Sequence, residues 1–226
     1  MTRKLTLGLL WLGFIIYAFF LSPPLQPNTF ELIKDLSTGQ FAGINPLIVA
    51  LFNIMGVFPL IYGCLLLIDG RSQKLPAWIF LLGSLGTGAF ALLPYLVLRE
   101  PNSQFAGEKS AILKFFDSRW FGTSLAIGAI SLVVYGISQG NWADFSQQWQ
   151  TSRFIHVMSL DFCALCLLFP VLLGDDMARR QLTDRRVFWA VALIPFLGAA
   201  LYVALRPPLT TSTSPEASLN QPATSR

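Results

Sequence analysis

The chain has 226 residues, of which 54% are hydrophobic and 12% charged, and its formal net charge at pH 7 is +4. Soluble domains carry about 25% charged residues, so most of this surface is not expected to face water. No basic stripe with interleaved aromatic residues lies outside the apolar runs, so nucleic acid is not an expected partner. The expected fold class is all-α, a polytopic membrane helical bundle, because helices satisfy their own backbone hydrogen bonds in lipid.

Six apolar runs are each about long enough to cross a bilayer, which takes about 20 residues. We therefore expect about six transmembrane helices with short interfacial helices between them, in an integral membrane bundle over residues 1–206. The approximate bounds of the six spans are 5–21, 46–68, 77–98, 120–137, 154–173 and 187–205. The first run lacks a small-residue cleavage site before Pro23, which favours an uncleaved anchor over a signal peptide.

Three connections are expected to form short helices at the membrane surface. One begins at Asn28, a capping residue followed by Glu31 three positions later, and another covers Ala111–Phe116. The third carries three aromatic residues on one face before the fifth run, namely Trp142, Phe145 and Trp149. Surface anchoring and docking of a partner both remain open for these helices.

Residues 207–226 are rich in Pro, Ser and Thr and are expected to be a disordered tail. The orientation of the bundle does not follow from its charges. With six spans, Arg3 and Lys4 favour an N-terminus inside, whereas the denser basic loops before spans four and six favour it outside. A missed or re-entrant segment would also explain this conflict.

Asp161 is the most informative residue, because it is ionisable and lies in the apolar fifth run. Such a group is costly in a membrane and must face protein or water. It fits a proton or cation relay, half of a buried ion pair, or a hydrogen bond that fixes helix packing. The candidate partners are Asn53, Tyr62, Tyr95, Tyr135, Tyr202, Arg99 and Arg206.

His156 is the only histidine, which excludes a haem held by two histidines of this chain and the histidine-rich di-iron sites. It can still be a single axial ligand to chlorophyll, the one cofactor kept open, or a proton shuttle. A hydrogen bond to the backbone, to Asp144 or to Ser152 is the structural alternative. His156 and Ser159 share a small, polar stripe that faces away from Asp161, so the fifth span is expected at the centre of the bundle.

Other motifs favour packing over chemistry. Cys163 and Cys166 are spaced for close helix contact, and no further ligands for zinc lie nearby. The charged segment 175–186 is expected to be a loop that touches anionic lipid, with Asp175 and Asp176 as weak candidates for a divalent metal. No phosphate loop, nucleophile elbow or metalloprotease motif is present, so an enzyme is not expected. No internal repeat of the transporter kind is evident.

Several stretches resemble a family of multi-pass membrane proteins of unknown function from cyanobacteria and chloroplasts. These stretches are Ala50–Pro59 (ALFNIMGVFP), Asp69–Trp78 (DGRSQKLPAW), Gly88–Tyr95 (GAFALLPY) and Phe154–Cys163 (FIHVMSLDFC). The resemblance implies a photosynthetic membrane, thylakoid or plasma membrane, and no catalytic residues.

The first functional expectation is a non-enzymatic accessory protein that assembles or stabilises a larger complex in that membrane, or binds a pigment there. The alternative is a small transporter or proton-coupled carrier that uses Asp161 and His156, with Ser159 and Asn53 as further intramembrane polar candidates. The lipid bilayer is a partner in both hypotheses.

Overall fold

The computed structural model describes residues 2–105 and 107–209, and the regular elements in these ranges are all helical, which confirms the all-α prediction. The predicted disorder of the tail lies, from residue 210 on, outside the described residues. The helices are α1 (Thr2–Ile16) with its π-helical continuation η1 (Tyr17–Leu21), α2 (Thr29–Thr38), α3 (Pro46–Asp69) with the 3₁₀ turn η2 (Gly70–Ser72), α4 (Ala77–Thr87), α5 (Ala89–Leu98), α6 (Ala111–Phe116), α7 (Arg119–Gln139), α8 (Trp142–Thr151), α9 (Arg153–Leu168), α10 (Pro170–Arg179), α11 (Arg185–Leu193) and α12 (Leu197–Leu205).

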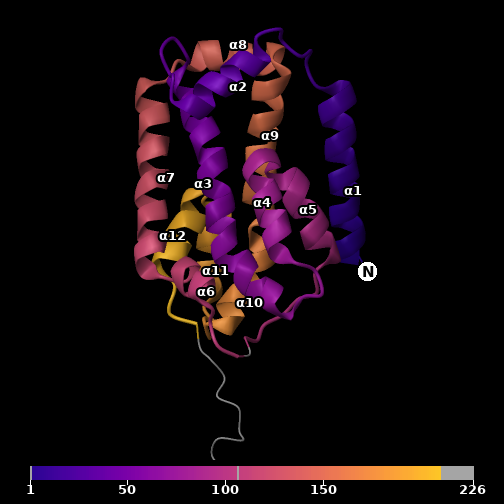
Figure 1. Ribbon diagram of the computed structural model, residues 1–226, viewed down its shortest axis with the longest axis vertical. Coiled ribbons are helices and arrows are strands. Elements are labelled where there is room, and N and C mark those ends of the chain that lie inside the picture. The colour runs from indigo at the N-terminus through magenta and orange to yellow at the C-terminus, as the bar shows by residue number, and fades with distance from the viewer. Residues whose placement is uncertain (1, 106, 210–226) are drawn as a thin grey trace, which may run out of the picture.

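Within the described ranges, four helices are long and apolar enough to cross a membrane. They are Thr2–Leu21, Pro46–Ser72, Arg119–Gln139 and Arg153–Arg179. Their axes follow the long direction of the bundle (Figure 1). Four of the six predicted spans correspond to these helices, whereas the third and the sixth have a different structure.

The predicted third span, 77–98, is a hairpin of two short helices, α4 and α5, broken at Gly88. The legs have 11 and 10 residues, so each is about 15 Å long, half the thickness of a bilayer core. The outer ends of the legs meet, because the Gln73 side chain donates to the Glu100 carbonyl at 2.7 Å and accepts from its N–H at 2.9 Å. This first hairpin therefore enters and leaves at one end of the bundle.

The predicted sixth span, 187–205, is a second hairpin, formed by α11 and α12 with 9 residues each. Its chain reverses at Phe196, a non-glycine residue with φ 58°. The legs pack closely at Gly198, where an added Cβ would lie 2.5 Å from the Val191 carbonyl oxygen. The run is apolar enough for a span, but its two legs are each too short to be one.

The surface helices lie where the sequence predicts them. Helices α2 and α8 lie across one end of the bundle, and α6 lies at the other end (Figure 1). The side chains of Asn141, Ser110 and Ser118 accept hydrogen bonds that cap α8, α6 and α7, whereas Asn28 makes no side-chain capping bond to α2. Helices α2 and α8 thus close the end opposite to the outer ends of the hairpins.

The order of the elements repeats along the chain. A long helix, a helix across the closed end, a second long helix and a hairpin occur as α1, α2, α3 and α4–α5, and again as α7, α8, α9–α10 and α11–α12. Both hairpins extend from the same end of the bundle (Figure 1). The sequence did not reveal this repeat, whose halves run in the same direction.

Candidate functional site

Asp161 lies at the tip of the first hairpin. Its Oδ1 accepts a hydrogen bond from the Ala89 N–H at 2.8 Å, and its side chain is 5% exposed. Ala89 is the first residue of α5, so the carboxylate caps the positive end of this short helix. The start of α5 therefore stabilises the ionised carboxylate, against the desolvation that disfavours a buried charge.

Gly88 is the residue that lets the carboxylate approach the hairpin. Its backbone has φ 54° and ψ −124°, a conformation that favours glycine. A Cβ built on Gly88 would lie 1.7 Å from Asp161 Oδ2, so the carboxylate occupies the place of the missing side chain. The tip and Asp161 fit together only with glycine at this position.

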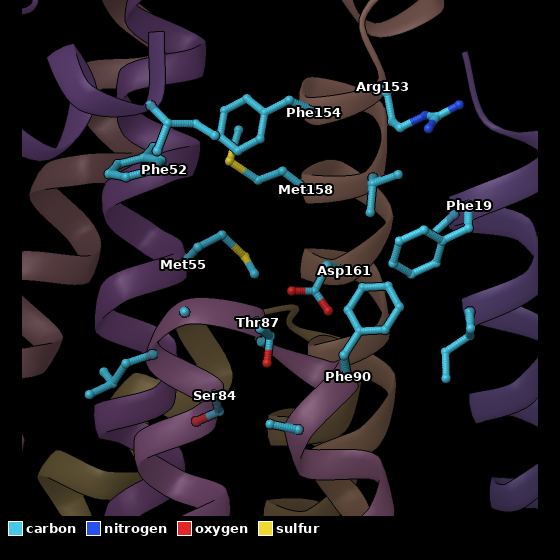
Figure 2. A pocket seen from close by; sticks show the side chains of 18 of the residues that line it. Phe19, Phe52, Met55, Ser84, Thr87, Phe90, Arg153, Phe154, Met158 and Asp161 are labelled. Atoms are coloured by element: carbon cyan, nitrogen blue, oxygen red, sulfur yellow. The ribbon is translucent and has the colours of Figure 1, made fainter. Parts of the chain in front are cut away.

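A cavity of about 840 Å³ lies directly above the tip. The first hairpin reaches only part of the way along the bundle, and the cavity fills the remaining length between α1, α3 and α9, with α2 at its upper end. In Figure 2, Asp161 points into this space between Met55 and Phe90. The carboxylate is thus part of the floor of the cavity, which we define as Asp161 together with Ser84–Ala91.

The walls of the cavity are almost entirely apolar. They include Trp11 and Phe19 from the first long helix, Phe52 and Met55 from α3, and Met158 from α9. Phe19 is 64% exposed. On the floor, Leu85 is exposed as well, so the cavity is open at the side of the bundle.

Helix α1 is held to the first hairpin along its length. The Trp11 Nε1–H donates to the Phe90 carbonyl at 3.0 Å, and the rings of Phe14 and Phe90 stack at 4.3 Å. At the outer end, Arg3 Nη2 donates to the Arg99 carbonyl at 2.8 Å. These contacts fix the wall of the cavity that α1 forms.

None of the predicted partners of Asp161 is hydrogen-bonded to it. Tyr62 donates to the Leu165 carbonyl at 2.6 Å, and Asn53 donates to the Val49 carbonyl at 2.8 Å. Tyr95 and Arg99 bind Asp69 instead. Tyr202 and Arg206 bind Asp176. The actual partner, a backbone N–H at a helix start, leaves no signature in side-chain chemistry.

His156 lies apart from the cavity floor and joins η1 to α8 and α9. Its Nε2 is 2.9 Å from the Tyr17 hydroxyl, and its Nδ1 is 2.9 Å from the Trp149 carbonyl oxygen. The Trp149 ring stacks on the imidazole at 4.3 Å. Both ring nitrogens are engaged, which matches the predicted backbone hydrogen bond and leaves neither nitrogen open to a chlorophyll magnesium in this arrangement.

The remaining polar candidates have local partners. Ser159 donates to the Ile155 carbonyl at 2.7 Å within its own helix. Cys163 is exposed and Cys166 is half-buried, and both thiols are free. The polar stripe of the fifth span is therefore buried at His156 and open at Cys163. Asp161, on the other face, contacts the first hairpin.

The segment 175–186 is not a surface loop throughout, because α10 carries it into a buried ion-pair cluster at the base of the hairpins. At the first hairpin, Asp69 Oδ2 accepts from Arg99 Nε at 2.8 Å and from the Tyr95 hydroxyl at 2.6 Å. Asp69 Oδ1 accepts from Arg99 Nη2 at 2.6 Å and from Arg179 Nη2 at 2.5 Å. Asp175 also pairs with Arg99.

The second hairpin has a matching cluster. Asp176 Oδ2 accepts from the Tyr202 hydroxyl at 2.7 Å, from Arg206 Nη1 at 3.1 Å and from Arg180 Nε at 2.8 Å. Arg180 also pairs with Asp117 at 2.6 Å. These arginine pairs account for the carboxylates that the sequence left open for a metal, and no group of metal-ligating side chains is found in residues 2–105 and 107–209.

The two clusters share one pattern. In each, an aspartate from a long helix binds a tyrosine and an arginine from the second leg of the hairpin that follows. The aspartate and the tyrosine are 26 residues apart in both cases, and the aspartate and the arginine are 30 residues apart in both. This equal spacing is the sequence signal of the repeat.

The chain matches no protein-family model, and no curated protein or solved structure matches it either. The resemblance to a family from cyanobacteria and chloroplasts therefore stays a prediction.

Proposed function

We propose that the protein is a membrane protein that binds a lipid-like molecule in the cavity above the first hairpin. The observation that carries this proposal is the cavity itself, about 840 Å³ in volume, with apolar walls and one carboxylate in its floor. This size lies within the range of about 300–1,000 Å³ that is usual for small-molecule sites. In a bilayer, the open side of such a space faces hydrocarbon chains, so its occupant comes from the membrane.

The tips of the two hairpins differ in a way that favours a single binding site. The tip of the second hairpin is sealed, because Phe196 is 2% exposed and its ring packs edge-on against Phe58 with centroids 5.1 Å apart. The tip of the first hairpin instead presents Gly88 and a carboxylate to a cavity. A bundle built only for structural support would not need this difference between its two halves.

The proposal is tested by fluorescence quenching in lipid nanodiscs, with a long-chain alcohol that carries bromine on its chain as the quencher. Trp11 lines the cavity, so a bound chain should quench it in a saturable way. Gly56 also lines the cavity and has nothing within 4 Å of its missing Cβ, so Gly56→Leu should fill the space and reduce the quenching several-fold. A Trp11→Phe variant identifies the part of the signal that belongs to the cavity.

Gly128 supplies the matched control for the cavity-filling variant. It lies on α7, and its missing Cβ likewise has nothing within 4 Å. Gly128→Leu should leave the quenching of Trp11 unchanged. Quenching that rises linearly without saturation and is the same in Gly56→Leu would mean that surrounding lipid alone contacts Trp11, and the proposed binding function would be abandoned.

The hairpins also bear on the orientation of the chain. With four spans and two hairpins, the basic residues within 2–209 all lie at the end where the hairpins enter, except Lys34 and Arg153. Basic residues are enriched on the cytoplasmic side of membrane proteins, so we propose that this end, together with Arg3 and Lys4, is cytoplasmic. In this proposed topology the conflict in the charge count disappears, because neither hairpin is counted as a span.

The accessory role in a photosynthetic membrane remains a proposal that is compatible with ligand binding. For the proton-coupled carrier, the repeated halves and the short hairpins are the favourable features, because transporters are often built from repeats with broken helices. Asp161 would be the coupling residue, and His156, which is hydrogen-bonded to Tyr17 away from the floor, would not share its path. A carrier predicts pH-dependent uptake into vesicles that Asp161→Asn abolishes.

A further inference from the structure

The chemistry of the cavity floor narrows the class of molecule that can bind there. The floor contains three polar side chains, Ser84, Thr87 and Asp161. The Ser84 hydroxyl donates to the Leu81 carbonyl at 2.7 Å, and the Thr87 hydroxyl donates to the Gly83 carbonyl at 3.0 Å. Since each hydroxyl has one hydrogen, both oxygens can then only accept a further bond.

Asp161 adds an acceptor of the same kind. Its Oδ1 is taken by the Ala89 N–H, whereas Oδ2 has no hydrogen bond to another described residue, and the side chain lines the cavity. The bond from the Ala89 N–H favours the ionised carboxylate, whereas burial favours the neutral acid. A ligand that brings a hydrogen-bond donor to Oδ2 stabilises the ionised form, which carries no hydrogen to donate. With the two hydroxyls already committed and Asp161 ionised, every polar side-chain atom of the floor that is open to a ligand is an acceptor.

The same arrangement disfavours anions. The start of a helix commonly binds phosphate or carboxylate groups, but here Asp161 already occupies that place. A second negative charge would face this carboxylate in an apolar space, where repulsion is strong. Among the described residues that line the cavity, Arg153 is the only basic one, eight residues before Asp161 on α9 and therefore about 12 Å above the floor. Its Nε donates to the Pro23 carbonyl at 2.9 Å, which holds the side chain at the upper end of the cavity.

We infer that the ligand is an elongated apolar molecule whose inner end is a hydrogen-bond donor, either a hydroxyl or an ammonium group, received by Asp161. This inference rests on the proposed function, because it concerns the same cavity. We therefore expect long-chain alcohols and amines to bind at the floor more tightly than fatty acids, esters and hydrocarbons of the same length.

The test compares probes that differ only at one end. Saturated chains of equal length ending in a hydroxyl, an ammonium, a carboxylate, a methyl ester or a methyl group compete with the bromine-labelled chain for quenching of Trp11. The alcohol or the amine should bind about tenfold more tightly than the ester and the hydrocarbon, as expected for a hydrogen bond to a charged acceptor. Comparison of the alcohol with the amine identifies which of the two donors the site prefers.

Asp161→Asn sharpens the comparison. Its Oδ1 can still accept from Ala89, and its amide then presents a donor to the cavity. The amine should lose about tenfold in affinity, and the ester should become equal to the alcohol. The control variant Met158→Leu changes the apolar wall and should alter all probes alike.

The possible failures are distinguishable. If no probe competes with the labelled chain, the binding function itself is wrong. If all chains compete equally, or the acid or the ester competes best, the cavity binds lipid but the assignment of a donor end is overturned. The probe series is also measured on the unaltered protein. The assignment of a donor end can therefore be tested even if a variant fails to fold.

Discussion

Replacing Gly88 with alanine should unfold the tip of the first hairpin and abolish binding in the cavity. The added Cβ would lie 1.7 Å from Asp161 Oδ2 and 2.6 Å from its Cγ, so the carboxylate would have to leave. The backbone at φ 54° adds strain for a residue with a side chain, which costs about 1–3 kcal/mol. With the lost hydrogen bond to Ala89, we expect the free energy of unfolding to fall by about 3 kcal/mol or more. Thermal unfolding in detergent measures this change.

Gly86 provides the control for this substitution. It lies two positions earlier on α4, is exposed, and has nothing within 4 Å of its missing Cβ. Gly86→Ala should therefore be neutral or stabilise the helix by up to about 1 kcal/mol. Combining Gly88→Ala with Asp161→Ala should recover part of the lost stability, because the clash is removed. Equal stability of the Gly86 and Gly88 variants would show that the carboxylate does not lie at the tip.

Asp69→Asn should destabilise the bundle by about 3–5 kcal/mol. Asp69 is fully buried and accepts hydrogen bonds from Arg99, Arg179 and Tyr95, so losing its charge leaves buried guanidinium groups without their main counter-ion. The change in midpoint of thermal or denaturant unfolding measures the effect. The equivalent variant Asp176→Asn should be destabilised to a similar degree, because the two clusters share one geometry.

Glu100 is the control for the loss of a buried carboxylate. It follows Arg99 in the chain and is exposed, and only its backbone bonds to Gln73. Glu100→Gln should change the free energy of unfolding by about 0.5 kcal/mol or less. If Asp69→Asn were as mild as Glu100→Gln, the ion-pair cluster would not be what holds the base of the hairpin.

The sequence predicted the helical class and the four long helices because apolar length is a direct signal of both. It could not separate a span from a hairpin, since each leg of the hairpin 77–98 is as apolar as a true span. The local cues were Gly86-Thr87-Gly88 and Ile194-Pro195-Phe196, which interrupt the two runs in the middle. The global cue was the conflict between the basic residues at the N-terminus and those of the later loops, because two re-entrant segments would remove this conflict.

For the site, the sequence identified Asp161 but not its partner. Hydrogen bonding to a backbone N–H depends on where α5 starts, and that start follows from the conformation of Gly88 rather than from any side chain. The ion-pair cluster was readable in principle, because Tyr95 and Arg99 recur as Tyr202 and Arg206 at the same spacing from an aspartate. The burial of the cluster could not be read from the sequence, because charged residues next to a chain turn usually form a solvated surface.

The most direct test of the fold is the side of the membrane on which single cysteines react, in a background with the natural cysteines replaced by alanine. Lys74 precedes the first hairpin and Glu108 follows it, and both are exposed, as is Gln40 at the other end. A membrane-impermeant maleimide should label Lys74→Cys and Glu108→Cys from the cytoplasmic side only, and Gln40→Cys from the opposite side only. Labelling of Lys74→Cys and Glu108→Cys from opposite sides would mean that residues 77–98 cross the membrane, and would contradict the hairpin, the cavity above it and the function proposed for it.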